Sequence, residues 1–271
     1  MKNKRTIYMV MSVFIAFLLS ISWTIVALTQ TTTLTNDLSL KGKTNKENFI
    51  LGEPVTVEFE FINEGDDSVK VAGSGVESGG LKIFIAQGQD REYKEYFIGD
   101  WGRKHGQYIS LEPKQLHRFK GATILWNGKP NVSHLNETAA ARVLKGKITT
   151  EYAFPEPGVY FIKGLSYFGE NATPIESEPI KVVIEEPVGD DLDVWNQIKG
   201  NKEIAYLMQH SAFDTGKEAK KEQLNNQVEQ IFVQYPNSIY SSYLKSNLEK
   251  YKARQKVLKE SLEKAIIKPK N

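Results

Sequence analysis

The side chains best suited to chemistry stand together in one short segment, Gly99–Gly106. It contains a carboxylate, an indole, a guanidinium and an imidazole, from Asp100, Trp101, Arg103 and His105. Glycine at both ends indicates a loop, and a loop with such groups can bind a ligand or a partner. With a further carboxylate brought close by the fold, the same groups could serve a hydrolase as acid and base. Loops also collect polar residues without such a role, so a purely structural loop is the competing interpretation.

Metal and nucleophile chemistry has no support in the spacing of the other reactive side chains. No two of the four histidines stand at the spacing of a metal pair on one helix face. The acidic run Asp190–Asp193 lacks the remaining ligands of an EF-hand calcium loop, and a favourable helix dipole explains it more simply. The chain has no cysteine, which excludes a disulfide framework, a thiolate metal site and a cysteine nucleophile. We therefore expect no cofactor, no metal ion and no catalytic residue.

The composition is that of an ordinary globular protein. The 271 residues have room for one large or two small domains, and 40% hydrophobic residues can form a sizeable core. A net charge of +2 argues against a dedicated nucleic-acid binder. Residues 217–271 are more basic, with twelve Lys or Arg against six Asp or Glu. On helices this is ordinarily a solvated face, and contact with a membrane or cell-wall polyanion is the sharper alternative.

The N-terminal residues 1–33 have the pattern of an export signal. Lys2, Lys4 and Arg5 precede a long uncharged and largely apolar run. The run is longer than the core of most cleaved signals and approaches the length that spans a bilayer, so a removed signal peptide and an uncleaved N-terminal anchor both remain open. Either alternative places the rest of the chain across the cytoplasmic membrane, as a secreted, periplasmic or anchored protein. Membrane contact is expected only through this segment.

The most regular pattern in the chain is the alternation of apolar and polar residues over Val55–Asn63. A period of two predicts a strand with one face in a core and one in water. Gly52 breaks the chain before this strand, and Pro54 stands at its start, where a missing backbone donor does least harm. After a turn, residues 68–71 are expected to return as the second strand of a hairpin. Further short strands separated by turn signals predict an antiparallel β-sandwich over residues 34–187.

Near the end of the predicted sandwich, Pro157 and Gly158 precede Tyr160. In immunoglobulin-like sandwiches, a tyrosine near the start of the penultimate strand returns its hydroxyl to upstream backbone as a tyrosine corner. Tyr160 has that place, so we expect an immunoglobulin-like sandwich, with an ordinary core tyrosine as the alternative. The polar residues 127–147 do not fit the strand pattern and are expected to form a long insertion. The strand pattern resumes at 148–154.

After residue 188 the apolar period changes to that of an α-helix. Two short amphipathic segments precede two longer ones, and an apolar stripe in the last continues toward Ile267. Residues 188–271 are therefore expected to form an αα-hairpin preceded by two shorter helices. The junction Tyr235–Leu244 resembles the helix–turn–helix junction of tetratricopeptide-like repeats, although such arrays need about three repeats. A helical appendix packed on the sandwich is the alternative.

The segment Leu51–Val55, the turn at Asn63 and the segment Pro157–Tyr160 resemble immunoglobulin-like domains of exported bacterial proteins of uncharacterised function. The same glycine, proline, asparagine and tyrosine residues are similar to those that mark turns and strand starts in the bacterial intracellular proteinase inhibitor family. The resemblance covers about Leu38–Pro187 and rests on fold-marking residues, so it implies an architecture rather than an activity. The export signal, the insertion and the helical tail do not suit an intracellular inhibitor, and no reactive-loop residue is carried over.

Together these features predict a mainly β protein with an α-helical C-terminus that acts as a non-catalytic exported binding module. The expected partner is a protein or an envelope component, and the candidate surfaces are the Gly99–Gly106 loop, the insertion and the basic helical face. A proteinase inhibitor with an immunoglobulin-like domain is the alternative. A hydrolase built on Asp100, Arg103 and His105 is a third hypothesis.

Overall fold

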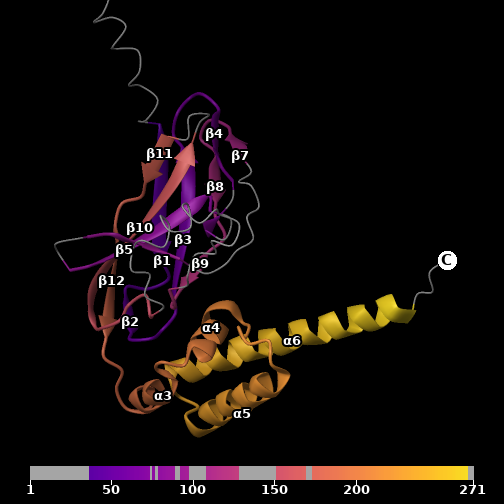
Figure 1. The fold of residues 1–271 in the computed structure, drawn as a ribbon. Helices are drawn as coiled ribbons and strands as arrows, with labels where there is room; N and C mark the ends of the chain where they lie inside the picture. Colours follow the sequence, from indigo (N-terminus) through magenta and orange to yellow (C-terminus); the bar gives the residue numbers. More distant parts are fainter. Residues whose placement is uncertain are drawn as a thin grey trace, which may run out of the picture.

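The computed structural model places strands first and helices after them along the chain. Within the described residues, twelve strands in two sheets are followed by four helices (Figure 1). Side chains are described as far as Lys264. The described residues are 37–73, 75–76, 79–88, 92–97, 108–127, 151–168 and 173–267.

The smaller sheet is built around β3 (Val55–Asn63), whose residues are alternately buried and either half-buried or exposed. β1 (Leu38–Thr44) pairs antiparallel with one side of β3. On the other side, β3 pairs with β8 (Leu116–Arg118) and β9 (Ala122–Ile124). The strand that the alternation predicts is therefore confirmed, with one face in the core.

The larger sheet is centred on β10 (Gly158–Phe168). β12 (Ile180–Glu185) and β5 (Leu81–Gln87) pair antiparallel with its two sides. The remaining strands of this sheet extend from these three. They are β2 (Asn48–Ile50), β4 (Val69–Ala72), β6 (Lys94–Tyr96), β7 (Tyr108–Leu111) and β11 (Thr173–Glu176).

The two sheets pack face to face, and the ring of Phe59 fills the space between them. A Cβ built at Gly42, opposite Phe59 on β1, would lie 2.6 Å from this ring. A Cβ built at Gly164, on β10 of the larger sheet, would lie equally close, at 2.6 Å. Glycine at both positions therefore opens the space that the buried ring occupies, and the result is a β-sandwich.

The expectation that residues 68–71 form a hairpin with β3 is wrong. β4 pairs with β7 and with the end of β10, so it belongs to the larger sheet. The buried side chain of Asn63 accounts for this crossover. Its Nδ2 donates to the carbonyls of Asp67 (2.8 Å) and Leu111 (3.0 Å), and its Oδ1 accepts from the N–H of Gly65 (3.1 Å). These bonds tie the turn after β3 to the end of β7 and so direct the chain into the other sheet.

Two other expectations for the sandwich also need correction. β2 runs parallel to β12, so the sandwich is not wholly antiparallel. These two strands are more than a hundred residues apart in the chain, and no hairpin dictates their relative direction. Of the strand expected at 148–154, the described residues 151–154 form only an isolated bridge between Tyr152 and Trp126.

The helical part agrees with its prediction. α3 (Asp190–Ile198) and α4 (Lys202–His210) are short, and α5 (Glu218–Gln234) and α6 (Ile239–Ile267) form the hairpin. Pro236 lies in the turn between the last two, where it cannot continue α5. Among the described helices, none combines the length and the apolar character that a membrane crossing requires. The helices lie together at one end of the sandwich (Figure 1).

Candidate functional site

The helices dock on the sandwich at the turn between β2 and β3, which we call the docking turn (Leu51–Pro54). Gly52 in this turn has a φ of +81°, in the left-handed region that favours glycine. A Cβ at Gly52 would lie 2.1 Å from Cζ3 of Trp195 in α3. The docking turn can therefore meet the indole ring only because residue 52 has no side chain.

A row of four aromatic rings crosses from the sandwich to the helices beside the docking turn. Successive centroids are 5.1, 5.0 and 6.1 Å apart along Trp126, Tyr152, Trp195 and Tyr240. Tyr240 of α6 is fully buried, and its hydroxyl donates to the carbonyl of Leu51. Burial raises the pKa of the Tyr152 and Tyr240 hydroxyls, because a phenolate would lose its hydration there. The row buries apolar area across the junction, and the Tyr240 hydroxyl fixes the position of α6.

A buried carboxylate makes a second connection between the docking turn and α6. The side chain of Glu53 is 1% exposed and lies 2.7 Å from the ammonium of Lys46. Its oxygens also accept from the N–H of Ile50 (3.1 Å) and from the hydroxyl of Tyr243 in α6 (3.0 Å). Because an unpaired buried charge is costly, these donors stabilise the carboxylate in one orientation. Glu53 thus joins the sandwich to α6.

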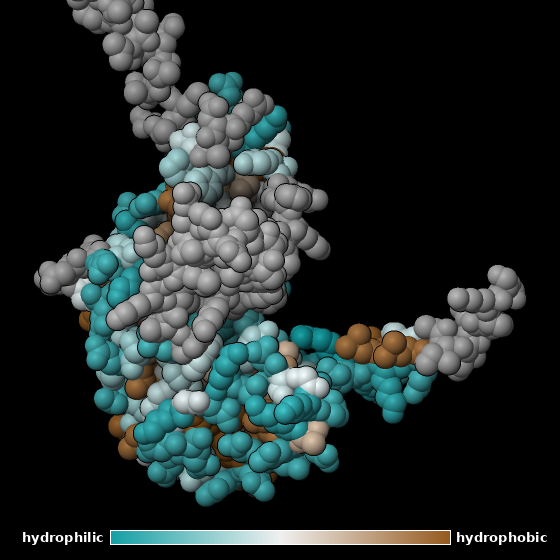
Figure 2. Space-filling model, viewed as in Figure 1, coloured by the Kyte–Doolittle hydropathy of each residue, from teal (hydrophilic) through white to brown (hydrophobic). Residues whose placement is uncertain are grey.

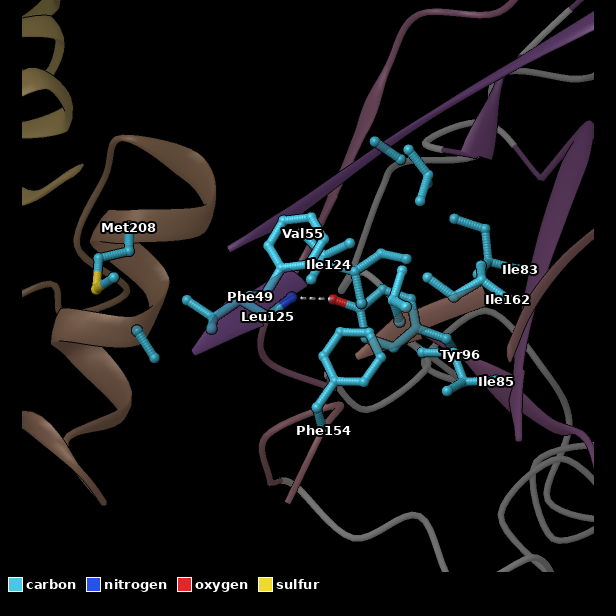
Figure 3. Close-up of a cluster of buried hydrophobic side chains, with 14 of the residues drawn as sticks. Phe49, Val55, Ile83, Ile85, Tyr96, Ile124, Leu125, Phe154, Ile162 and Met208 are labelled. Atoms are coloured by element: carbon cyan, nitrogen blue, oxygen red, sulfur yellow. Dashed lines mark hydrogen bonds between the residues drawn. The ribbon is translucent and has the colours of Figure 1, made fainter. Parts of the chain in front are cut away.

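Gln209 of α4 connects this helix to the segment that follows β9 in the sandwich. Its Oε1 accepts from the N–H of Trp126 at 2.6 Å, and its side chain also hydrogen-bonds the Tyr96 hydroxyl. That hydroxyl accepts from the N–H of Leu125 at 3.2 Å and donates to the carbonyl of Trp126 at 3.0 Å. Figure 3 shows the Tyr96–Leu125 bond inside the buried cluster, with Met208 of α4 on the helix side. Polar and apolar contacts together join α4 to the sandwich.

Asp191 of α3 caps the N-terminus of α6. One of its carboxylate oxygens accepts from the hydroxyl of Ser238 and from the N–H of Ile239, both at 2.8 Å. This bond satisfies a backbone donor that the first turn of α6 leaves unpaired. Within the part of the chain that the structure describes, no three acidic or histidine side chains are grouped as a metal site would need. Asp191 of the acidic run therefore has a structural role.

We expect Asp191→Ala to lower the free energy of unfolding by about 1–2 kcal/mol, because the start of α6 loses its cap. Asp193→Ala is the matched control, since Asp193 is exposed on the same helix and should change stability by less than about 0.5 kcal/mol. Urea denaturation followed by far-ultraviolet circular dichroism measures both. Equal effects of the two substitutions would contradict the capping role.

The C-terminal part of α6 leaves the other helices and projects into solvent (Figure 1). Tyr251 is the last buried residue of α6 in the described part. An ion pair between Lys252 and Glu229 of α5 lies at the base of this projection. Every residue from 252 to 264 is exposed, and we call this stretch the arm. At 1.5 Å per residue, the arm is about 20 Å long. Helices in proteins gain most of their stability by packing an amphipathic face, and the arm has no such packing among the described residues.

The apolar seam by which α6 packs on the other helices continues along the arm. Leu248 and Tyr251 are buried. Leu248 and Tyr251 are three residues apart, and the seam continues with separations of four, three and four residues to Gln255, Leu258 and Leu262. The two leucines are 50% and 64% exposed. Figure 2 shows apolar surface on the arm. This spacing is the one that occurs in helix–helix packing.

Basic side chains flank the exposed part of the seam. Arg254 precedes Leu258 by four residues, and Lys259 precedes Leu262 by three, so each lies beside a seam leucine on the helix surface. Glu260 is two residues from both leucines and lies on the opposite face. Over the whole arm, five Lys or Arg against two Glu give a net charge of +3. Among the described residues, Arg254 and Lys259 have no ion-pair partner.

A surface pocket of about 210 Å³ lies on the smaller sheet, away from the helices. Its charged groups are largely paired, with Lys43 3.4 Å from Glu58 and Arg118 3.0 Å from Glu60. Exposed pairs of this kind contribute little energy. The lining also includes Lys41, Gly42, Phe59 and Phe119. We assign the pocket no function.

The residues predicted to form a binding patch, Asp100, Trp101, Arg103 and His105, lie outside the described residues. Their role stays a prediction. The same holds for most of the insertion, 128–147, and for residues 1–33.

The residues predicted to mark the fold all lie in the described part. The Tyr160 hydroxyl donates to the carbonyl of Glu156 at 2.7 Å, the upstream bond that defines a tyrosine corner. Pro157 precedes β10, and Gly158 begins it with a φ of +152°. Pro54 is buried in the docking turn beside Gly52. Sequence reasoning placed Gly52 and Pro54 at a strand start but missed that Trp195 of α3 packs on Gly52.

Comparison with known proteins does not assign the chain to a family. No protein-family model and no curated protein matches it. Spo0M, a sporulation control protein from Bacillus subtilis, is similar at a TM-score of 0.31 and 8% identity, over 60% of this chain and 54% of that one. The CARDB domain of PF1109 from Pyrococcus furiosus is similar at 0.25 and 15% identity, over 55% of this chain and 94% of that one.

The alkylpurine DNA glycosylase AlkC from Pseudomonas fluorescens gives a TM-score of 0.29 at 8% identity, over 55% of this chain and 30% of that one. The chain thus spans about half of Spo0M and less than a third of AlkC. At these TM-scores the similarities support no conclusion about family or activity.

Proposed function

We propose that this protein is a non-catalytic binding module, exported across the cytoplasmic membrane, whose arm binds a partner. The observation that carries the proposal is the continuation of the α6 seam into solvent, where Leu258 and Leu262 have no packing partner among the described residues. An exposed apolar seam bordered by charge is a typical helix-binding surface. The expected partner is a protein or a component of the cell envelope.

In this proposal the sandwich is immunoglobulin-like and serves as a rigid base for the helices. The bond from Tyr160 to Glu156 supports that architecture. The docking turn supports the rigidity, because Gly52, Glu53 and Leu51 each contact a helix. Export rests on the basic and apolar pattern of residues 1–33. The inhibitor hypothesis rests on the resemblance at Leu51–Val55, Asn63 and Pro157–Tyr160, which concerns the fold and names no reactive residue. The hydrolase hypothesis rests on Asp100, Arg103 and His105, which lie outside the described residues.

Site-specific photo-crosslinking in the organism that encodes the chain tests this proposal. The full chain would carry a photoreactive residue in place of Leu262, on the seam, or in place of Ala253, which is exposed on the opposite face of the arm. We expect a discrete adduct from position 262 and none from position 253. The absence of an adduct at 262, or equal adducts at both positions, would contradict a binding arm.

A further inference from the structure

We infer that the arm binds an acidic amphipathic helix of another protein, packed along the seam that contains Leu258 and Leu262. This inference rests on the proposed function and names its partner. It depends on three observations: the spacing of the seam, the charges beside it, and the position of the arm relative to the start of β1.

The spacing of the seam favours a helix as the occupant. Within the molecule, Leu248 and Tyr251 of the same seam are buried where α6 packs against other helices. The four-and-three spacing continues unchanged through Gln255 to Leu258 and Leu262. A second helix can therefore extend the packing with side chains inserted between those of the arm. A strand, with its period of two, would not match this row.

The polar Gln255 makes this packing selective for register. It is the one polar residue between the buried Tyr251 and the exposed Leu258 along the seam. A single polar residue in an otherwise apolar seam fixes the alignment of paired helices, because a shifted partner would leave its amide facing an apolar side chain. The partner is therefore expected to place a polar residue opposite Gln255.

The charges beside the seam exclude some helices and favour others. Arg254 and Lys259 stand on the two sides of the exposed leucines, where charged residues of paired helices meet. A second copy of this arm would bring cations against cations in either orientation. A helix with glutamate or aspartate beside its apolar stripe would form ion pairs on both sides. The arm is therefore complementary to an acidic helix and not to itself.

The position of the arm favours a protein over an anionic membrane surface. β1 begins at Leu38, opposite Asn63, and its other end leads through β2 to the docking turn. The start of β1 and the helices therefore lie at opposite ends of the sandwich (Figure 1). The apolar N-terminal segment precedes Leu38 in the sequence. A membrane that contained this segment would have the sandwich between itself and the arm.

A designed peptide of about three heptads provides the probe, with one glutamine to face Gln255, leucine at the other seam positions and glutamate beside them. We expect the full chain to bind this labelled peptide in a fluorescence anisotropy titration. Leu258→Asp should weaken binding by at least roughly tenfold. Raising the salt concentration from 50 to 300 mM should weaken binding several-fold, because exposed ion pairs are screened. A matched peptide with lysine in place of glutamate should not bind.

Charge reversal separates this inference from a general affinity for apolar helices. The double variant Arg254→Glu and Lys259→Glu should lose the acidic peptide and bind the lysine peptide instead. The matched control is Lys256→Glu with Lys264→Glu, which makes the same change in net charge on the far side of the arm. We expect the control to keep its preference for the acidic peptide. An unchanged preference in Arg254→Glu with Lys259→Glu would overturn the inference.

Two further measurements identify a different occupant if there is one. Binding to vesicles of anionic lipid that Leu258→Asp abolishes, with no binding of the acidic peptide, would assign the arm to a membrane surface. Sedimentation equilibrium showing a dimer that the same substitution dissociates would assign it to a second copy. A protein adduct at position 262 without any preference for the acidic peptide would leave the binding arm in place and remove only this inference.

Discussion

Replacing Gly52 by alanine is expected to lower the free energy of unfolding by about 2–5 kcal/mol. Two effects contribute. The φ of +81° is unfavourable for a residue with a Cβ, which costs about 1–2 kcal/mol. The added methyl would also lie 2.1 Å from the Trp195 ring and push α3 from the docking turn, at a further cost of about 1–3 kcal/mol.

Gly200→Ala is the matched control for this prediction. Gly200 has a φ of +80°, nearly that of Gly52, but a Cβ there would meet no atom within 4 Å. Only the backbone effect applies, so the expected loss is about 1–2 kcal/mol. Urea denaturation measures both variants, and the difference between them reports the contact with Trp195. Equal losses would show that the helices do not depend on the docking turn.

The second large effect is a loss of stability at high pH. Burial raises the pKa of the Tyr96 and Tyr240 hydroxyls above the ordinary value of 10, because these side chains cannot be hydrated as phenolates. In the unfolded chain both hydroxyls ionise near pH 10. Stability is therefore fully present below about pH 10 and falls as the pH rises above it, since the unfolded state then binds fewer protons. Each tyrosine contributes a slope of about 1.4 kcal/mol per pH unit, so the two together contribute about 3.

Alkaline titration provides the measurement. Tyrosinate absorbance at 295 nm for these groups should appear together with the loss of the circular dichroism signal, in one transition. The variant Tyr96→Phe with Tyr240→Phe should lose stability less steeply with pH, by about 3 kcal/mol per unit. Tyr108→Phe is the control for the loss of a hydroxyl at an exposed position. Full ionisation of all tyrosines while the fold persists would contradict the prediction.

The local elements could be predicted from the sequence, because the pattern that defines each lies within a few residues. The alternation over Val55–Asn63 specifies β3, and the change of period after residue 188 specifies the four helices. The pairing of strands could not be predicted in the same way. β4 lies in the larger sheet because Asn63 binds the end of β7, a contact between residues 48 positions apart. No local pattern encodes such a contact.

The candidate site, too, has one part that the local sequence predicts and one part that it does not. The apolar stripe of α6 is visible in the sequence as far as Ile267, since it depends on spacing alone. The second half of this stripe has no packing partner in the described part of the molecule. The reason is the difference in length between α5 and α6. α5 has 17 residues and α6 has 29, so the longer helix extends past the shorter one. Residues chosen for their chemistry, such as Asp100 and His105, lie outside the described part.

The two bonds from α6 to the docking turn join residues 189 and 190 positions apart in the chain. Most of the polypeptide therefore has to be synthesised before Leu51 and Glu53 can meet Tyr240 and Tyr243. Until then the buried carboxylate of Glu53 lacks its bond from α6, and contacts of such long sequence separation form slowly. A chain cut before α6 would therefore leave the docking turn without the hydrogen bonds that Tyr240 and Tyr243 donate.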